Sequence, residues 1–298
     1  MGGDAAMTWA DFVAGWDAIF REPVIAGTVG GAVLGFLGMY VVLRRMVFVS
    51  AAVTSAAAMG VALAFYVEIH HAMHVDPLYM AVGLSLATMA LFIGDGARMR
   101  LSRESLLGLT YAVTGGLTLL IESRISQEAH DIHSILFGDA VLVRDLDYYA
   151  ILGAGGVALA LHVWWFRGVT FAAFDTATAR VQGLPVRALN GFVLLTIGVM
   201  VGVAARALGA LPVFAFTTLP AIAALVIGVR LPWAFALATA FGALAGGGGY
   251  LVATFRDLPV GGSQTVTAGA LALAAMAGYG AVSAVRRGLR RRGGREPR

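Results

Sequence analysis

Candidate metal-ligating side chains gather in two short polar stretches of an otherwise apolar chain. Five of the six histidines lie there, accompanied by aspartate and glutamate. Zinc and manganese favour imidazole and carboxylate ligands, so this composition is typical of residues that contact a divalent metal. The candidate ligands, with Glu68, Asp76, Glu128 and Asp139 beside them, are His70, His71, His74, His130, Asp131 and His133. The alternative is that each is a solvated loop residue, and the sequence leaves both open.

His70 and His74 are four residues apart, so they share one helix face if the preceding apolar helix continues that far. A tight site with four ligands would retain a metal ion, whereas loosely placed ligands let it pass. We therefore expect transient metal contact at these residues.

Two absences from the composition exclude other kinds of site. The 298 residues include no cysteine, which removes disulfides and thiolate metal sites. They include no lysine, so the lysine of a Walker-type phosphate loop cannot occur. The H-E-x-x-H and G-x-S-x-G patterns of hydrolytic enzymes do not occur either. We expect no enzymatic activity and no bound cofactor, and any ATP hydrolysis must take place on another chain.

The composition indicates that lipid is the solvent for much of the chain. Hydrophobic residues make up 59% and charged residues only 13%, and the mean hydropathy is +0.82. A soluble domain of this length needs more charge to cover its surface. The 39 glycines suit closely packed membrane helices, as do the four-residue spacings Gly27/Gly31/Gly35 and Gly242/Gly246.

Nine apolar stretches approach the roughly 20 residues that a membrane-spanning helix needs. They are 24–43, 47–67, 78–94, 105–122, 147–166, 189–208, 211–229, 233–254 and 265–285. The seventh is short and contains Pro212 and Pro220, so it is either a kinked span or a broken helix that does not cross fully. The expected fold class is an all-α polytopic membrane protein with eight or nine transmembrane helices.

Three regions follow from this pattern: an N-terminal interfacial segment (1–23), a transmembrane domain (24–285) and a basic cytoplasmic tail (286–298). The first contains a short interfacial helix, indicated by apolar residues at helical spacing: Trp9, Phe12, Val13, Trp16 and Phe20. The tail is either an orientation anchor or a patch that binds lipid or a partner.

Arginines orient the predicted bundle. They concentrate at 44–45, 98–103, 167–187, 230 and in the tail, which the positive-inside rule places in the cytoplasm. The chain is then a multi-pass inner-membrane protein with its N-terminus outside and its C-terminus inside. The spans hold almost no ionisable residue apart from His162, for which a packed side chain is the favoured interpretation. Because ion-coupled carriers place such residues at mid-membrane, we expect an external energy source.

Three stretches carry a family resemblance. They are LRRMVFVSAAVTSAAAMGVALA (43–64), SILFGDAVLV (134–143) with FDTATARVQGLPVRALN (174–190), and ARALGALPVFAFTTLPAIAALVIGV (205–229) with DLPVGGSQTV (257–266). Because these stretches occur in this order over roughly residues 25–285, the chain resembles the permease subunits of zinc, manganese and iron ABC importers. The resemblance implies a bundle related to those of cobalamin and siderophore importers, and import of a divalent metal as the transported substrate. It also implies an ABC ATPase subunit, an extracytoplasmic metal-binding protein and a second permease copy, identical or not, as partners in the bilayer, and no nucleic acid.

Two cytoplasmic segments are candidates for coupling to the ATPase. Over 174–190, apolar residues recur every three or four positions and predict one amphipathic helix, which either docks on a partner or is a surface linker. The turn at 227–233 follows Pro220 as the coupling element does in related importers, or Arg230 there is a lone positive-inside anchor. The residues that the resemblance assigns to coupling are Phe174, Asp175, Arg180, Gly183 and Arg230.

The predicted transport path departs from the family pattern in the second span. Where the family has an aspartate followed four residues later by a histidine, this chain has Ala51 and Ser55. Together with Pro212 and Pro220, these residues are expected to border the path. Without the two ligands the cargo is either a bare ion or a metal chelate or cofactor. A membrane assembly factor is the alternative outside transport.

Overall fold

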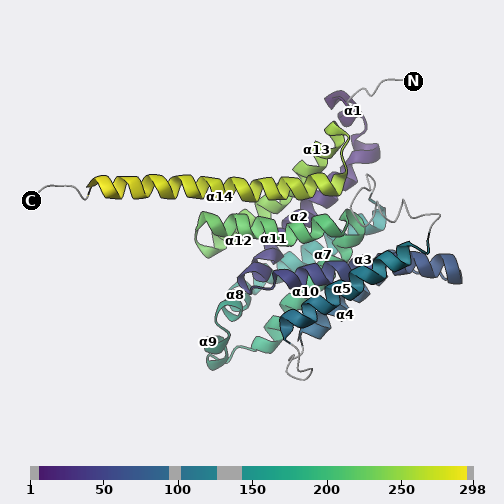
Figure 1. Cartoon of the computed structure of the whole chain (residues 1–298), viewed down its shortest axis with the longest axis horizontal. Coiled ribbons are helices and arrows are strands. Elements are labelled where there is room, and N and C mark those ends of the chain that lie inside the picture. Colours follow the sequence, from purple (N-terminus) through teal and green to yellow (C-terminus); the bar gives the residue numbers. More distant parts are fainter. Residues whose placement is uncertain (1–6, 94–101, 126–142, 294–298) are drawn as a thin grey trace, which may run out of the picture.

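The regular structure is helical throughout the residues that the computed structural model describes, which are 7–93, 102–125 and 143–293 (Figure 1). The long helices are α2 (Arg21–Leu43), α3 (Val47–His71), α4 (Pro77–Ile93), α5 (Arg103–Glu122), α7 (Asp145–Trp164), α10 (Val186–Leu208), α11 (Ala210–Ile227), α12 (Leu231–Ala243) and α14 (Val260–Gly293). The short ones are α1 (Trp9–Ala14), α8 (Phe166–Phe174), α9 (Thr176–Val181) and α13 (Gly249–Arg256), with the π-helical turns η1 (Trp16–Phe20) and η3 (Leu244–Gly248). The predicted all-α fold class is confirmed.

Eight helices of the described part are long and apolar enough to cross a membrane. Two of these spans are composite, because η1 continues into α2 and because α12, η3 and α13 form one rod over Leu231–Arg256. Helix α4 is apolar over Pro77–Phe92 but shorter, which makes it the ninth candidate. The prediction of eight or nine spans is confirmed, and the chain is a multi-pass membrane protein.

Helix α11 runs without a break although it contains two prolines. Pro212 lies in its first turn, where the missing N–H would have no helical partner in any case. Pro220 lies inside the helix, and the hydroxyl groups of Thr217 and Thr218 donate to the Phe214 carbonyl about one turn before them. Since α2 and α14 pack along it, α11 stays continuous, and the alternative of a broken helix is wrong.

Short polar residues and glycine set several helix boundaries. Before α4, the Asp76 carboxylate accepts a hydrogen bond from the Leu78 N–H (2.9 Å), and at the start of α5 the Ser102 hydroxyl accepts one from the Ser105 N–H (3.0 Å). Such side chains satisfy N–H groups that have no partner within the helix. After α11, Gly228 has a φ of 72°, a conformation that costs glycine little, and it turns the chain into α12.

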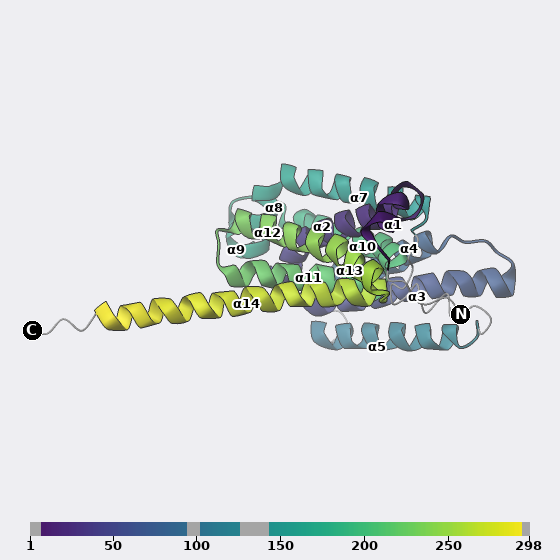
Figure 2. The same cartoon turned by 90° about the horizontal axis from the view of Figure 1, so that it is seen from above.

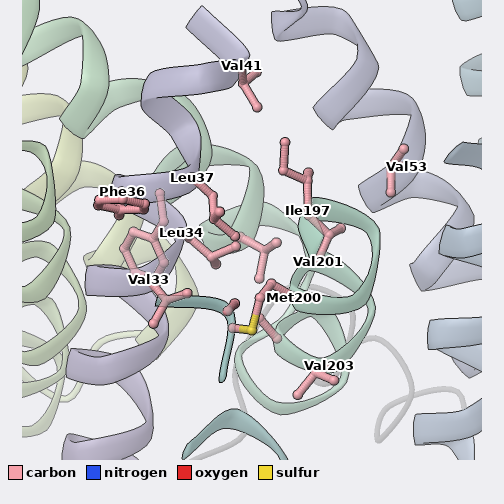
Figure 3. Close-up of a cluster of buried hydrophobic side chains, with 14 of the residues drawn as sticks. Val33, Leu34, Phe36, Leu37, Val41, Val53, Ile197, Met200, Val201 and Val203 are labelled. Carbon is pink, nitrogen blue, oxygen red and sulfur yellow. The ribbon is translucent and has the colours of Figure 1, made fainter. Parts of the chain in front are cut away.

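Helix α2 runs through the middle of the bundle and supplies much of its core. Its Val33, Leu34 and Leu37 are fully buried and lie beside Ile197 and Met200 of α10 (Figure 3). Helices α3, α7, α11 and α12 pack on its other sides. A helix enclosed in this way has apolar residues all round and no polar face.

The two ends of the bundle differ. The inner end, as we call it, carries α8, α9, the turn from α11 to α12 and the free end of α14 (Figures 1 and 2). The outer end carries α1, α13 and the end of α3. The arginine-rich segments that the positive-inside rule assigned to the cytoplasm and that the structure describes therefore gather at one end.

Helix α2 approaches the α12–η3 rod so closely that only glycine fits between them. A Cβ at Gly31 would overlap the Gly242 carbonyl oxygen, and a Cβ at Gly242 would overlap that of Gly31. A Cβ at Gly246 would likewise overlap the Gly27 carbonyl oxygen, whereas a Cβ at Gly27 would first meet Gln264 Nε2. There Gln264 Nε2 donates to the Gly246 carbonyl (2.9 Å). This contact, called the glycine seam below, confirms the close packing predicted from the glycine spacing.

We predict that Gly31→Ala destabilises the folded chain by about 1–3 kcal/mol, because its methyl group must push two backbones apart. Thermal unfolding of the purified protein in lipid nanodiscs measures this. The control is Gly156→Ala in α7, where a Cβ meets no atom within 4 Å and stability should be unchanged or slightly higher. Equal melting temperatures for the parent and Gly31→Ala would contradict the glycine seam.

Candidate functional site

A seam between α3 and α5 contains the two positions that the sequence placed on the transport path. Ala51 and Ser55 are partly exposed, whereas their neighbours Ala52 and Ala56 are buried. Ser55 Oγ lies 2.8 Å from Thr114 Oγ1 of α5. Of the two side chains at positions 51 and 55, only Ser55 has an atom that can bind a cation, and this atom is a neutral hydroxyl oxygen. An ion can move past such a group, but the group cannot hold the ion tightly.

A row of threonines on α5 continues this seam. Thr110, Thr114 and Thr118 lie one turn apart, and each hydroxyl bonds to a backbone carbonyl one turn earlier at 2.8 Å. The hydroxyl protons of Thr110 and Thr118 face the backbone of α5, whereas the Thr114 hydroxyl also donates to Ser55 Oγ and so links α5 to α3. The opposite face of α5 is apolar and exposed at the edge of the bundle, including Leu109 and Leu120 (Figure 2).

The outer histidines do not form the arrangement expected from their spacing. Helix α3 ends at His71 and Ala72 has a φ of 49°, so His74 does not share a helix face with His70. His70 instead bonds to the Tyr66 carbonyl (3.2 Å), and His74 Nδ1 lies 2.7 Å from Glu68 Oε1. Within the described ranges, no three His, Asp or Glu side chains are grouped as a metal site would require. His130, Asp131 and His133 lie outside the described residues.

Near the outer end, a cluster of four charged residues joins three helices. Arg144 bonds to Asp147 (3.0 Å) at the start of α7 and to Asp76 (3.1 Å) before α4, and Arg206 of α10 lies 3.7 Å from Asp147. The side chains of Asp147 and Arg206 are only 1% and 11% exposed. Sequence analysis missed this cluster, because only the i, i+3 spacing of Arg144 and Asp147 is local, and its partners lie far away in the chain.

The cluster keeps its surface members ionised. Partial burial opposes ionisation of Asp76, but hydrogen bonds from Arg144 and from the Leu78 N–H outweigh it and hold the pKa of Asp76 below its usual value. The hydrogen bond to Asp147 is the largest of the effects that raise the pKa of Arg144. A carboxylate whose pKa is lowered by folding stabilises the fold at every pH above the pKa that it has in the unfolded chain. The contribution of Asp76 should therefore be lost as the pH falls through its pKa in the folded chain.

At the inner end, the predicted coupling segment 174–190 contains the end of α8, the whole of α9 and the start of α10. Helix α8 ends at Phe174, and Asp175 leaves the helical conformation to cap α9, accepting a hydrogen bond from the Thr178 N–H (2.9 Å). Gly183 has a φ of 79°, so α9 ends before it. The short helix predicted within 174–190 is therefore present as α9, and an aspartate cap and a glycine turn limit it to Thr176–Val181.

The coupling candidates are nevertheless exposed at this end. The side chains of Phe174 and Val181 are 56% and 88% exposed, and Arg180 is exposed as well. The Thr178 hydroxyl lowers the pKa of Asp175, which stays anionic. Arg230 is exposed where it precedes α12. Apolar and charged side chains thus remain accessible together at the inner end.

The sequence favoured a packed side chain for His162, and in the structure this side chain is fully buried. Its Nδ1 lies 2.9 Å from the Ala158 carbonyl, and its ring contacts those of Phe36, Tyr40 and Phe192. Pro212 and Pro220 are also buried, within α11. The structure therefore places Ala51 and Ser55 at an accessible seam and both prolines in the packed interior.

Known proteins share this architecture. Residues 17–279 match the model of the ABC 3 transport family. The manganese transport system membrane protein MntC of Bacillus subtilis is 30% identical over 190 residues, which cover 60% of this chain and 43% of that protein. The manganese import system permease protein ScaB of Streptococcus gordonii is 25% identical over 185 residues, which cover 62% and 64%. The chain therefore matches less than two thirds of the length of these relatives.

Two solved structures have the same fold. The structure titled PsaBC from Streptococcus pneumoniae in complex with Fab superposes with a TM-score of 0.76 at 26% identity, over 90% of this chain and 95% of that one. An inward-facing conformation of a putative metal-chelate type ABC transporter gives 0.68 at 14% identity, over 91% of each chain. The second likeness concerns the fold alone.

We predict that Asp147→Asn destabilises the chain by about 3 kcal/mol, because it leaves the buried Arg206 without its anionic partner. The matched control is Asp145→Asn, two residues earlier in the same helical turn, where the side chain is exposed and the effect should stay within about 0.5 kcal/mol. Thermal unfolding in nanodiscs compares the two. Similar losses for both variants would show that the cluster has no special role.

Proposed function

Because this chain belongs to the ABC 3 transport family, we propose that it is the permease subunit of an ABC importer that moves a divalent metal ion into the cytoplasm. The observation that carries the proposal is the family match over residues 17–279. Two of the related proteins described above are named for manganese transport or import, and manganese is therefore the first candidate, before zinc and iron.

The chemistry of the α3–α5 seam favours manganese within this set. Its Ser55 and Thr114 present oxygen atoms, and no imidazole or thiolate lies at Ala51 or Ser55. Manganese accepts oxygen ligands readily, whereas zinc sites in proteins are dominated by nitrogen and sulfur. Neutral oxygens bind weakly, which suits an ion that must leave again. The outer histidines and Asp131 are proposed to make passing contacts as the ion enters.

The energy for transport is proposed to come from a separate ATPase subunit. The chain has no lysine for a phosphate loop, and its spans lack the mid-membrane charges on which ion-coupled carriers depend. The exposed side chains of α9 and Arg230 at the inner end are the proposed contact surface. ATP binding and hydrolysis would then rock the helices between outward-open and inward-open states, with no covalent chemistry on this chain.

Two further partners are proposed. The exposed apolar face of α5 is suited to a second permease copy, identical or not, so that the seam behind it would lie near the interface. An extracytoplasmic metal-binding protein would deliver the ion at the outer end.

The second candidate function, import of a metal chelate or cofactor by the same architecture, is favoured by the absence of ligands at Ala51 and Ser55.

Uptake by cells tests the cargo. Deletion of the gene should lower accumulation of radioactive manganese at low external concentration, and the intact gene should restore it. In the same assay, joint replacement of His70, His71, His74, His130 and His133 by alanine should raise the manganese concentration needed for half-maximal uptake. Unchanged accumulation of manganese, zinc and iron after deletion would contradict a bare metal cargo and favour the chelate.

We predict that Arg230→Glu weakens co-purification with the ATPase subunit by about tenfold, because it reverses a charge at the proposed contact. ATP hydrolysis by the complex should fall with it. The control is Arg256→Glu, an equally exposed arginine at the other end of the α12–α13 rod, which should retain the partner. An unaltered complex with unaltered ATPase activity in Arg230→Glu would contradict the assignment.

A further inference from the structure

An apolar cavity opens at the inner end between the end of α7, α8 and the first turns of α10 and α12. Its volume is about 1300 Å³, above the roughly 300–1,000 Å³ of pockets for drug-sized ligands. Aromatic side chains dominate the wall, among them Trp165, Phe192 and Phe235. None of the residues assigned above to the path, the coupling surface or the outer histidines lines it.

The cavity wall is already formed. Trp165 and Phe192 meet edge to face with ring centroids 5.5 Å apart, and Phe166 meets Phe235 in the same way at 5.1 Å. Phe36 of α2 closes the back, 5.0 Å from Phe235. Because these rings fix one another, a ligand can enter without remodelling the helices, which lowers the cost of binding.

The depth of the cavity falls within one leaflet of a bilayer. On α12 its lining runs from Pro232 to Thr239, which at 1.5 Å per residue is about 10 Å along the helix. The hydrocarbon of one leaflet is about 15 Å deep, half of the core thickness of about 30 Å. Trp164 and Trp165, 84% and 49% exposed, lie at the mouth, as tryptophan does at headgroup depth.

The mouth of the cavity is electropositive. Among the described residues that line it, Arg167 carries the only charge. The N-termini of α10 and α12 have no side-chain cap, and Ala188 and Pro232 from their first turns line the cavity. Both helix macrodipoles therefore direct their positive ends to the cavity that Arg167 also lines, and this arrangement favours an anion there.

We propose that this cavity binds one anionic phospholipid of the cytoplasmic leaflet. The acyl chains lie among the aromatic side chains, and the headgroup phosphate lies between Arg167 and the starts of α10 and α12. A free phosphate would leave the apolar depth empty. A peptide segment of a partner would bring backbone N–H and C=O groups to a wall that offers them few partners. The bound lipid joins α8 to α12, and the proposal does not depend on the transported cargo.

Retention of lipids on the purified full-length chain tests the proposal. The protein is equilibrated with equal amounts of phosphatidylglycerol and phosphatidylcholine that carry the same acyl chains, and retained lipids are counted by native mass spectrometry. One phosphatidylglycerol per chain should be retained in preference. Arg167→Gln should lower its retention about fivefold, since each basic group near a membrane surface contributes about that factor. Ala236→Trp, which puts an indole ring into the space proposed for the acyl chains, should also lower it.

Each variant has a matched control outside the lining. Arg45→Gln removes another exposed arginine of the inner end, and Ala240→Trp adds the same bulk one turn further along α12. Both should retain the lipid. In the unaltered chain, photoactivatable phosphatidylglycerol should crosslink to residues 159–168, 184–192 or 232–239, which keeps the test independent of how the variants fold. Equal retention of the two lipids, equal loss in Ala240→Trp, or crosslinks confined to other segments would overturn the proposal.

Discussion

The backbone contact between α2 and the α12–η3 rod is the constraint on which the rest of the bundle depends. At Gly31 and Gly242 each helix occupies the space that a side chain of the other would need. Within a bilayer apolar side chains gain little by leaving lipid, so close packing of this kind holds helices together. Once α2 is fixed there, its remaining faces carry the apolar residues on which α3, α7, α10 and α11 pack.

This rigid centre separates two ends with opposite character. The outer end is tied by a charge cluster in which Asp147 is almost completely buried, so helices α4, α7 and α10 are held together there. The inner end leaves Phe174, Val181 and Arg230 exposed, and it contains the apolar cavity with Arg167 at its mouth. The proposed permease, which would take its energy from another subunit, needs such an accessible surface, because the work of transport must enter through protein contacts.

The seam at Ser55, which is proposed to border the transport path, offers no strong metal ligand at the two positions Ala51 and Ser55. With Ala51 beside it, the seam offers a hydroxyl of α3 and the threonine row of α5, all of them neutral. An ion that meets only such groups gains little binding free energy and is released readily. Specificity would then rest on the protein that delivers the cargo and on the outer residues.

The sequence by itself indicated the lipid environment, a bundle of eight or nine spans and the family, because hydropathy, charge and motif order are properties of short stretches. The glycine spacing likewise predicted close packing before its partner helices were known. Only the tertiary structure decided that Asp147 is buried between Arg144 and Arg206, that α3 ends before His74, and that five separate helices line the apolar cavity. Each of these depends on which distant residues become neighbours, and local periodicity carries no information about that.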